Sequence, residues 1–169
     1  MTEGKDRVFP AKRLEQFATS VLVAMGIPET DARTCAARMT EADLRGVDTH
    51  GIFRLPHYCR RIKVGGINLR PKLHVVRENA VTALVDGDNA MGHVIMTFAT
   101  QLAIRKASES GLAWIGIRNS NHSGPAAVYT TMPLAHDMIG MYMTVANANH
   151  MPPWGGVEML LGTNPLSVA

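Results

Sequence analysis

The sequence predicts an α/β fold that opens with a helical subdomain. Apolar residues recur at helical spacing over the first part of the chain, whereas short β-rich runs alternate with helical patterns after Pro71. The length of 169 residues is enough to bury a sizeable core without disulfide or metal crosslinks. We therefore expect a helical subdomain at residues 1–70 and an α/β domain at residues 71–169.

Two amphipathic helices are expected in the first subdomain. The first follows Pro10 and ends at Gly26, with these residues at helical spacing: Leu14, Phe17, Ala18, Val21, Leu22 and Met25. The second begins near Thr30 and ends near Gly46, with an inner face made of Ala32, Cys35, Ala36 and Met39. A glycine-rich loop at residues 64–66 then leads to the second domain.

The residues after Pro71 alternate between strand and helix patterns. We expect strands at 73–77 and 81–85, a helix at 91–110, a strand at 112–117, a helix after Pro125, and strands at 139–146 and from Leu166. Pro133 should kink or shorten the helix in which it lies, because proline removes an internal hydrogen bond. The apolar residues that close the sequence begin a strand pattern, and this suggests an incomplete fold.

The composition excludes several classes of protein. Apolar residues make up 46% of the chain and charged residues 18%, a balance that argues against a fibre, a disulfide scaffold or a membrane bundle. The net charge is +3 and basic residues never run longer than two, so nucleic acid is not an expected partner. The N-terminus lacks a signal peptide, and Cys35 and Cys59 suit reduced, packed thiols. We expect a cytoplasmic protein with no membrane attachment.

The stretch from Asp48 to Arg61 holds the first candidate site. If it is one helix, one face carries His50, Arg54, Tyr58 and Arg61, and the opposite face carries Ile52, Leu55, Cys59 and Ile62. A guanidinium can hold a carboxylate through two hydrogen bonds, and an imidazole exchanges protons near neutral pH. On spacing alone, a solvated polar face is the commoner interpretation, and Pro56 interrupts the helical pattern.

A polar loop, residues 118–125, follows the strand expected at 112–117. Ligands in α/β sheets usually bind at the carboxyl ends of strands, and a helix start supplies free N–H groups. His122 is therefore a candidate general acid or base. A capping loop whose side chains satisfy backbone groups explains the stretch about equally well.

The third candidate site lies between Asn147 and Pro165, where glycines and prolines cluster. Glycine lets the backbone approach a ligand closely, although an ordinary tight loop is the commoner explanation. The sequence contains no G-x-G-x-x-G fingerprint and no P-loop. Its seven histidines show no recognised metal-ligand spacing, and its aromatic residues are too sparse for a base-stacking surface.

Four segments together resemble the malate/L-lactate dehydrogenase family, which also contains ureidoglycolate and sulfolactate dehydrogenases and diketogulonate reductases. They are ADLRGVDTHGIFRLPHY at 42–58, DGDNAMGH at 86–93, IRNSNHSGPA at 117–126 and PPWGGVEMLLGTNP at 152–165. The resemblance implies hydride transfer between NAD or NADP and a 2-hydroxy acid. It also implies a homodimer and a non-Rossmann NAD(P)-binding α/β fold, of which residues 71–169 would be part.

The resemblance also implies roles for particular residues. His122 is the first candidate for the proton acceptor or donor and His50 the second, with Arg54 on the substrate carboxylate and Tyr58 nearby. The residues expected to line the cofactor and substrate cleft are Asn121, Ser123, Gly124, Pro125, Asn147, Gly162, Thr163, Asn164 and Pro165. No metal is implied.

Three positions depart from the family pattern, and so does the length. Ser123 stands where an aromatic residue is usual, His93 where glutamine is common, and Ala146 where a small hydroxyl residue is frequent. Family members are considerably longer, so we expect the N-terminal portion of such an enzyme. The alternative is a truncated, non-catalytic fragment that binds a ligand or partner weakly; a metal-binding histidine protein is less favoured because the ligand spacings are wrong.

Overall fold

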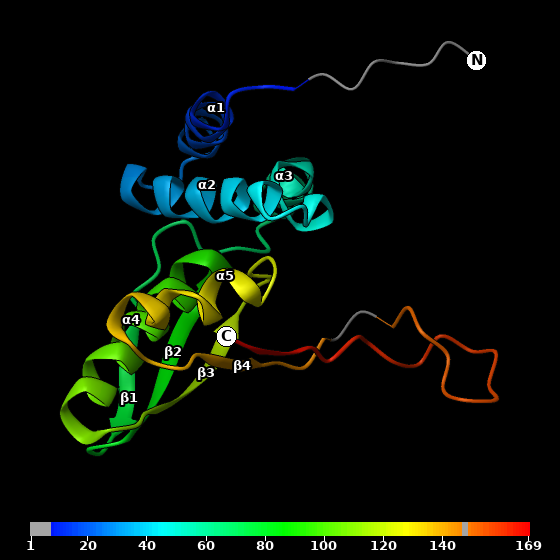
Figure 1. Ribbon diagram of the computed structural model, residues 1–169. Helices are drawn as coiled ribbons and strands as arrows, with labels where there is room; N and C mark the ends of the chain where they lie inside the picture. The colour runs from blue at the N-terminus through cyan, green and yellow to red at the C-terminus, as the bar shows by residue number, and fades with distance from the viewer. Residues whose placement is uncertain (1–7, 147–148) are drawn as a thin grey trace, which may run out of the picture. The chain divides into compact units, whose positions relative to one another are not determined.

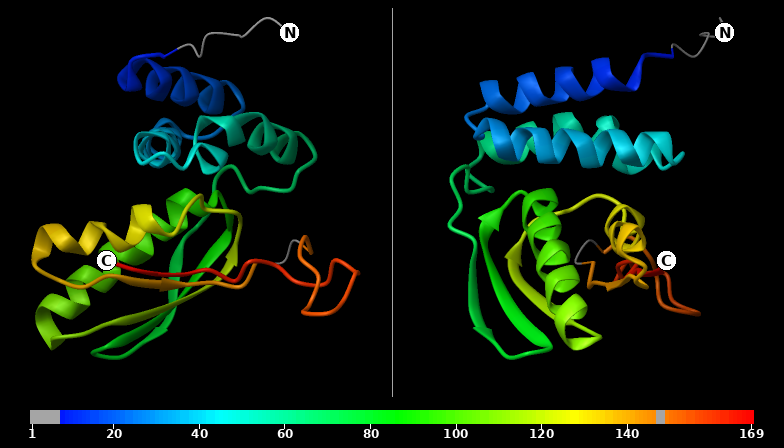
Figure 2. Two further views of the ribbon diagram at one scale, coloured as in Figure 1. Left: turned by 45° about the vertical axis from the view of Figure 1, so that its right-hand side comes forward. Right: turned by 60° about the vertical axis from the view of Figure 1, so that its left-hand side comes forward.

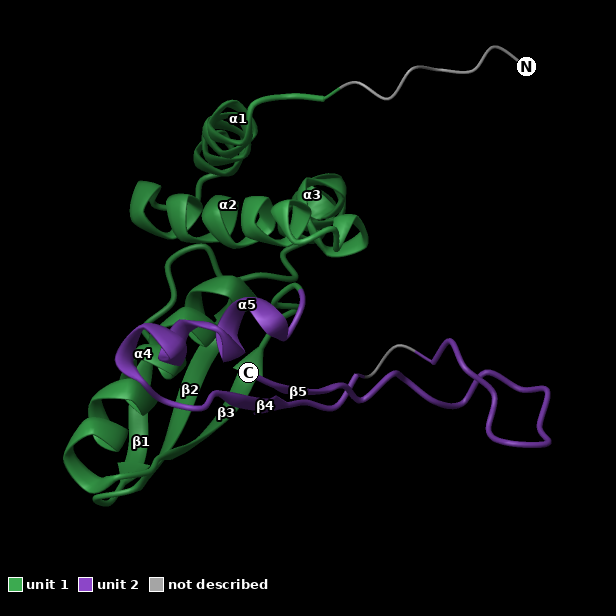
Figure 3. Ribbon diagram, in the orientation of Figure 1, with its two compact units in different colours: residues 1–124 green, residues 125–169 purple. Residues whose placement is uncertain are grey.

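The computed structural model describes residues 8–146 and 149–169, and Figure 1 shows the order of their helices and strands. The chain forms two compact units, residues 1–124 and 125–169, which are coloured separately in Figure 3 and are described here one at a time. No helix in the described ranges is long and apolar enough to cross a membrane.

Three helices and two short 3-10 turns begin unit 1. They are α1 (Ala11–Ala24), α2 (Glu29–Leu44), the 3-10 helices η1 (Asp48–His50) and η2 (Ile52–Arg54), and α3 (Leu55–Lys63). The first two helices confirm the predictions from periodicity. Pro10 and Pro28 stand at their N-caps, where a missing N–H costs no helical hydrogen bond.

The single helix considered for residues 48–61 is not formed. The chain breaks at Gly51, and Pro56 lies in the first turn of α3, where proline starts a helix and does not kink it. His50, Arg54, Tyr58 and Arg61 therefore do not form one polar face, and Tyr58 is buried while Arg61 is exposed.

Unit 1 buries two clusters of apolar side chains. The first joins α1, α2 and α3, and includes Ala18, Leu22, Cys35, Ala36, Met39, Tyr58 and Ile62. The second lies between the sheet and its helix, and includes Ala83, Val85, Ile95 and Leu102. Met91 belongs to the first cluster although it follows the sheet, so α4 begins where the two clusters meet.

A three-stranded sheet carries the second cluster. Strand β1 (His74–Glu78) pairs antiparallel with β2 (Thr82–Ala90), and β2 pairs parallel with β3 (Trp114–Ser120). Helix α4 (Gly92–Ser110) connects the two parallel strands and lies along one face of the sheet in Figure 2. The prediction of these four elements is confirmed, although β2 and β3 end five and three residues later than expected. Both extensions lead into the polar segments of the candidate site.

Unit 2 contains less regular structure. Helix α5 (Ala127–Thr130) stops before Pro133, and the 3-10 helix η3 (Met132–His136) follows it, as the expected shortening effect of proline predicts. Strands β4 (Met141–Met143) and β5 (Leu166–Val168) pair antiparallel. The strand expected from Leu166 is confirmed, whereas the strand expected at 139–146 has only three residues. Between β4 and β5, Met151 and Leu161 form an isolated bridge, and Trp154 is fully exposed.

Candidate active site

Tyr58 and His122 form the centre of the candidate site. Tyr58 lies on the inward side of α3, and His122 lies in the loop that follows β3. The Tyr58 hydroxyl oxygen is 2.8 Å from Nδ1 of His122, and the backbone N–H of Gly124 also donates to Nδ1 at 3.3 Å. Because an amide N–H can only donate, Nδ1 is an acceptor, and the neutral His122 ring carries its proton on Nε2.

The surroundings of His122 keep its ring neutral. Burial lowers its pKa to about 4, and the positive charges of His50, Arg54 and His57 act in the same direction. The side chain nevertheless keeps an exposed part, which a ligand can reach. His122 thus combines a neutral imidazole, a fixed orientation and access from solvent.

His50 stacks on His122. The two ring centroids are 5.4 Å apart and the ring planes differ by 27°. The hydroxyl oxygen of Thr49 lies 2.9 Å from Nδ1 of His50, and burial together with the charge of Arg54 lowers the His50 pKa. The two histidines proposed for proton transfer therefore lie side by side, and both are neutral near pH 7.

Arg54 supplies the positive charge of this cluster. Its Nε donates to the backbone carbonyl oxygen of Thr49 at 2.7 Å, and the side chain is half-buried. In the described ranges no carboxylate forms an ion pair with Arg54. The terminal nitrogens of the guanidinium therefore suit the carboxylate of a ligand, which a planar fork can hold through two hydrogen bonds.

Gly51 and Asp43 hold the segment that carries His50 and Arg54. The Ile52 backbone N–H donates to the Asp43 carboxylate at 3.0 Å. A Cβ atom at residue 51 would overlap that carboxylate, so a larger residue there would have to displace the Asp43 side chain from its hydrogen bond with Ile52. The glycine of the segment T-H-G therefore has a packing role of its own.

The segment between β2 and α4 fixes the loop that carries His122. The Asn121 side-chain amide donates to the carbonyl oxygens of Asn89 and Ala90, both at 3.0 Å, and its own oxygen accepts from Arg61 at 3.1 Å. A Cβ atom at Gly92 would overlap the carbonyl oxygens of Asn121 and His122. Asn121, predicted to bind cofactor, is therefore engaged within unit 1, and its cofactor role stays a prediction.

Asp86 anchors the start of the same loop. Its carboxylate accepts from the backbone N–H of Asp88 and from the Asn119 amide, both at 2.9 Å, and pairs with Arg118 at 2.8 Å. These hydrogen bonds, first among them the one from Asp88, lower the Asp86 pKa. The charged carboxylate connects the end of β2 to the end of β3, so Asp86 has a local structural role in the DGDN stretch.

The remaining predicted residues fall into three groups. Ser123 is buried and Gly124 has a φ of +79°, which favours glycine. Pro125 and residues 162–165 belong to unit 2, where the side-chain oxygen of Asn164 accepts from the backbone N–H of Ala146 at 2.9 Å. Asn147 lies outside the described residues. The structure therefore brings His50, Arg54, Tyr58, His122 and Gly124 together, and the other assignments stay predictions.

His93 lies next to the candidate site, although the sequence alone assigned it no role there. It lies in the first turn of α4, is fully buried, and meets the Tyr58 ring edge-on, with centroids 5.2 Å apart and planes at 87°. Its place in the stretch DGDNAMGH marked it only as a departure from a family pattern. Nothing in the spacing between residues 58 and 93 indicates that the two rings touch.

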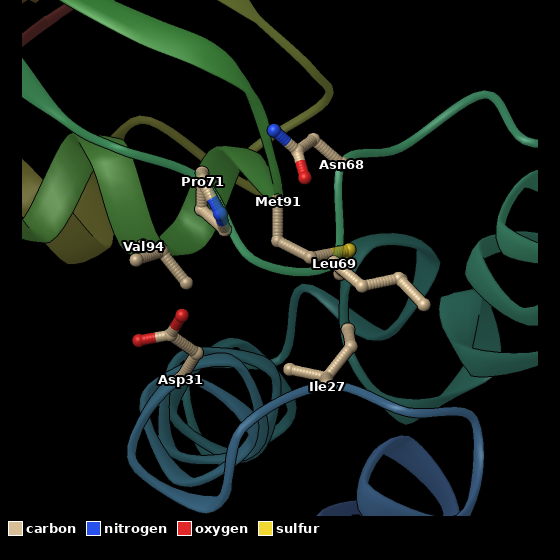
Figure 4. Close-up of a pocket in the computed structure, with 7 residues that line it drawn as sticks. All are labelled: Ile27, Asp31, Asn68, Leu69, Pro71, Met91 and Val94. Atoms are coloured by element: carbon tan, nitrogen blue, oxygen red, sulfur yellow. The ribbon is translucent and has the colours of Figure 1, made fainter.

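A small pocket in unit 1 lies elsewhere. Figure 4 shows it between the start of α2, the loop at 67–71 and the start of α4, with the Asp31 carboxylate among apolar side chains. Its cavity volume is about 10 Å³, far below the roughly 300–1,000 Å³ of ordinary ligand pockets. Burial raises the pKa of Asp31. None of the predicted site residues lines this pocket.

The comparisons with known proteins agree on one family. A family model described as malate/L-lactate dehydrogenase matches residues 9–169. Among curated proteins, malate dehydrogenase of Pyrococcus horikoshii is 44% identical over 163 residues, which cover 95% of this chain and 44% of the relative. L-Sulfolactate dehydrogenase of Methanocaldococcus jannaschii is 42% identical over 156 residues, covering 92% and 45%. Ureidoglycolate dehydrogenase (NAD(+)) of Escherichia coli is 32% identical over 156 residues, covering 92% and 44%.

Solved structures agree with the sequence comparisons. The malate dehydrogenase of Pyrococcus horikoshii superposes with a TM-score of 0.89 at 42% identity and covers 97% of this chain. The sulfolactate dehydrogenase of Methanocaldococcus jannaschii gives 0.91 at 38% identity over 96%. This likeness confirms the α/β fold expected from the sequence. The chain spans about half the length of these relatives, at 49% and 47% of the two solved chains.

Proposed function

The chain belongs to the malate/L-lactate dehydrogenase family, and on that premise we propose that it contributes to hydride transfer between a nicotinamide cofactor and a 2-hydroxy acid. The substrates that its relatives' names suggest are malate, sulfolactate and ureidoglycolate, and lactate is a further candidate. The observation that carries the proposal is the contact between Tyr58 and His122 beside His50 and Arg54. This cluster contains a proton carrier and a carboxylate receptor in one unit.

His122 is proposed as the group that exchanges a proton with the substrate oxygen. Oxidation of an alcohol carbon requires the hydroxyl proton to leave to a base. Tyr58 and Gly124 occupy Nδ1 of His122, so Nε2 is the nitrogen left for substrate. To accept the hydroxyl proton at Nε2, the neutral ring must first carry its own proton on Nδ1, where the Tyr58 hydroxyl oxygen can accept it in a hydrogen bond. In the reduction direction the doubly protonated ring donates its Nε2 proton to the substrate oxygen and keeps its Nδ1 proton, which the Tyr58 hydroxyl oxygen can accept in a hydrogen bond. His50 is the second candidate, and its stacking on His122 places it within the same cluster.

Arg54 is proposed to bind and orient the substrate carboxylate. Its bond to the Thr49 carbonyl restricts the side chain, so less conformational freedom is lost when the carboxylate binds. The bound negative charge also offsets the repulsion that Arg54 exerts on a protonated His122. Substrate binding and proton uptake by His122 are therefore expected to favour one another.

A nicotinamide cofactor would supply the hydride acceptor or donor. The donor set fits this chemistry, because the cluster consists of neutral rings and one guanidinium, and no carboxylate among the described residues pairs with Arg54. Ser123, Gly124 and Pro125 are proposed to border the cofactor, with Asn121, Asn147 and residues 162–165 completing the site. Either NAD or NADP suits this half of the family fold. We also propose a cytoplasmic homodimer, with no metal and no nucleic acid required.

The purified chain titrated with NADH and NADPH, and then assayed with malate, lactate, sulfolactate and ureidoglycolate, tests the proposal. Cofactor binding together with turnover is expected for a chain that is active as it stands. Absence of both would favour the alternative, a non-catalytic fragment that binds a ligand or partner weakly. Size-exclusion chromatography with light scattering tests the homodimer in the same preparation.

Variants then separate the proposed roles. His122→Ala should lower kcat by roughly 100-fold or more, the scale of a general acid or base, while a change of only a few-fold would transfer the role to His50. Arg54→Lys should raise KM, because a point charge cannot reproduce the bidentate fork. Unchanged KM and kcat in Arg54→Lys would remove Arg54 from the site.

A further inference from the structure

His93 occupies an unusual environment for a polar side chain. It is fully buried in the first turn of α4, and within the described part of the chain neither ring nitrogen has a hydrogen-bond partner. A buried polar group without a partner costs about 1–3 kcal/mol relative to a satisfied one. An apolar residue would fill this place at lower cost, so the imidazole calls for an explanation beyond simple filling of the core.

The contacts of His93 lead directly to the candidate site. Its ring meets the Tyr58 ring at 87° with centroids 5.2 Å apart, the edge-to-face arrangement that aromatic pairs prefer. On another side, the Nε2 atom lies against Gly124, close enough that a Cβ there would be 3.3 Å away. Tyr58 and Gly124 are the two groups that donate to Nδ1 of His122. His93 therefore touches both residues that orient His122 while not contacting a substrate itself.

We propose that His93 is a positioning residue that holds the Tyr58 ring and the Gly124 turn so that both meet Nδ1 of His122. The proposal deepens the proposed function, because it rests on His122 as the proton carrier. A planar ring suits this role, since it packs edge-on against Tyr58 and still leaves room for a turn at Gly124. An aliphatic side chain of similar volume would fill the space but would not define the angle of the phenol.

The charge state of His93 simplifies the test. Burial lowers its pKa to about 3, with the positive charges of His122 and Arg38 acting in the same sense, so the ring is neutral around pH 7. Removing a neutral ring changes the field at His122 very little. The charged or titratable groups that act on His122 are His50, Arg54 and His57, and all remain in a His93 variant. A shift in the titration midpoint of His122 then reports a change in the position of Tyr58 or Gly124 relative to Nδ1.

The experiment is an NMR titration of the histidine ring protons in the full chain, without ligand. His93→Leu should raise the midpoint of His122 by about one pH unit or more toward its ordinary value of about 6.5, because Tyr58 no longer holds Nδ1. His93→Phe, which keeps a ring, should leave the midpoint closer to that of the parent. Ile95→Val, a buried change in the same helix within the apolar cluster between the sheet and α4, should leave the His122 midpoint unchanged.

The outcomes decide the proposal without recourse to turnover. A folded His93→Leu with the parent's His122 midpoint would overturn it, as would equal shifts in the Leu and Phe variants. If the His93→Phe variant does not fold, the His122 midpoints of His93→Leu and Ile95→Val still decide the proposal: equal midpoints would overturn it. Failure of cofactor binding or turnover in the parent chain bears on the proposed function alone, because the titration needs neither.

Discussion

The hydroxyl oxygen of Tyr58 lies 2.8 Å from Nδ1 of His122, although 64 residues separate the two in sequence. Tyr58 comes from the helical part of unit 1, and His122 comes from the loop at the end of its sheet. Burial raises the pKa of the Tyr58 hydroxyl, so the phenol keeps its proton and can donate it in the hydrogen bond to His122. One contact thereby fixes the orientation of the proposed proton carrier and joins the two parts of the unit.

Tyr58→Phe should raise the pKa of His122. The ring that packs against His93 is kept, so the fold should persist, but the phenol hydroxyl that stabilises neutral His122 is lost. An NMR titration of the His122 ring should show a midpoint above the parent's value of about 4. Tyr142→Phe, a change in unit 2, serves as the matched control. An unchanged His122 midpoint in Tyr58→Phe would show that the hydrogen bond does not form in solution.

His93 and His122 should make the fold sensitive to acid. The pKa of His93 is lowered to about 3 and that of His122 to about 4, against about 6.5 in an unfolded chain. Between these values the unfolded chain binds more protons, so acid favours unfolding. The free energy of unfolding therefore falls as the pH drops below about 6.5, and the loss levels off near the lowered pKa values of the two histidines. Urea unfolding at a series of pH values measures this dependence.

His93→Leu should flatten the dependence of the unfolding free energy on pH. Around pH 5 one buried histidine contributes a slope of about 1 kcal/mol per pH unit, and the variant should lose that share. His136→Gln, a change at an exposed histidine, is the control. Asp31 and Asp43, whose pKa values burial raises, act with the opposite sign, and the comparison with the parent cancels them. Parallel slopes for parent and His93→Leu would contradict a neutral, buried His93.

Gly92→Ala should destabilise unit 1 and displace the loop that carries His122. The added Cβ would overlap the carbonyl oxygens of Asn121 and His122, which are backbone atoms that cannot turn aside. Overpacking of this kind costs about 1–3 kcal/mol or more. Gly116→Ala is a matched control, because its Cβ would meet Leu84 at an ordinary contact distance of 3.5 Å. Equal unfolding midpoints in urea for the two variants would show that the loop does not pack on Gly92 as described.

The regular elements follow from the sequence because their signals are local. The spacing of apolar residues predicts α1, α2 and α4, and glycine or proline marks their ends. Residues 48–61 contain the same signals but form two 3-10 turns before α3. The break falls at Gly51, where the backbone leaves helical geometry (φ −87°, ψ −145°), and the Asp43 carboxylate accepts from the Ile52 N–H directly after it. The spacing of apolar residues does not reveal this contact.

The sequence indicates which residues form the candidate site, but it does not predict how their side chains pack together. The residue types of His50, Arg54 and His122 indicate acid–base and carboxylate chemistry, and the structure brings these side chains together. The stacking of His50 on His122 depends on how η1 packs against the loop after β3, a long-range contact that spacing does not encode. The sequence marked His93 only as a departure from the family pattern for the same reason, because its contact with the Tyr58 ring is long-range.

The two cysteines should react very differently with a thiol reagent. Cys35 is fully buried in the helical cluster, and burial, with the charge of Asp31, raises its thiol pKa. Cys59 lies on α3 and is half-buried; burial also raises its thiol pKa, although the charges of Lys63 and Arg60 lower it. Because the thiolate is the reactive form and must also be reached, Cys59 should react slowly and Cys35 only after unfolding.

Single-cysteine variants separate the two rates. In Cys59→Ser, the remaining Cys35 should stay unreactive toward a disulfide reagent in buffer and react at once in denaturing urea. In Cys35→Ala, which keeps a small apolar side chain in the cluster, Cys59 should react in buffer. For Cys35 in the Cys59→Ser variant, the ratio of the labelling rates in buffer and in urea then measures how often the helical cluster opens. Rapid labelling of Cys35 in buffer would mean that the helical cluster is open in solution, and the Tyr58–His122 contact that depends on α3 could not persist.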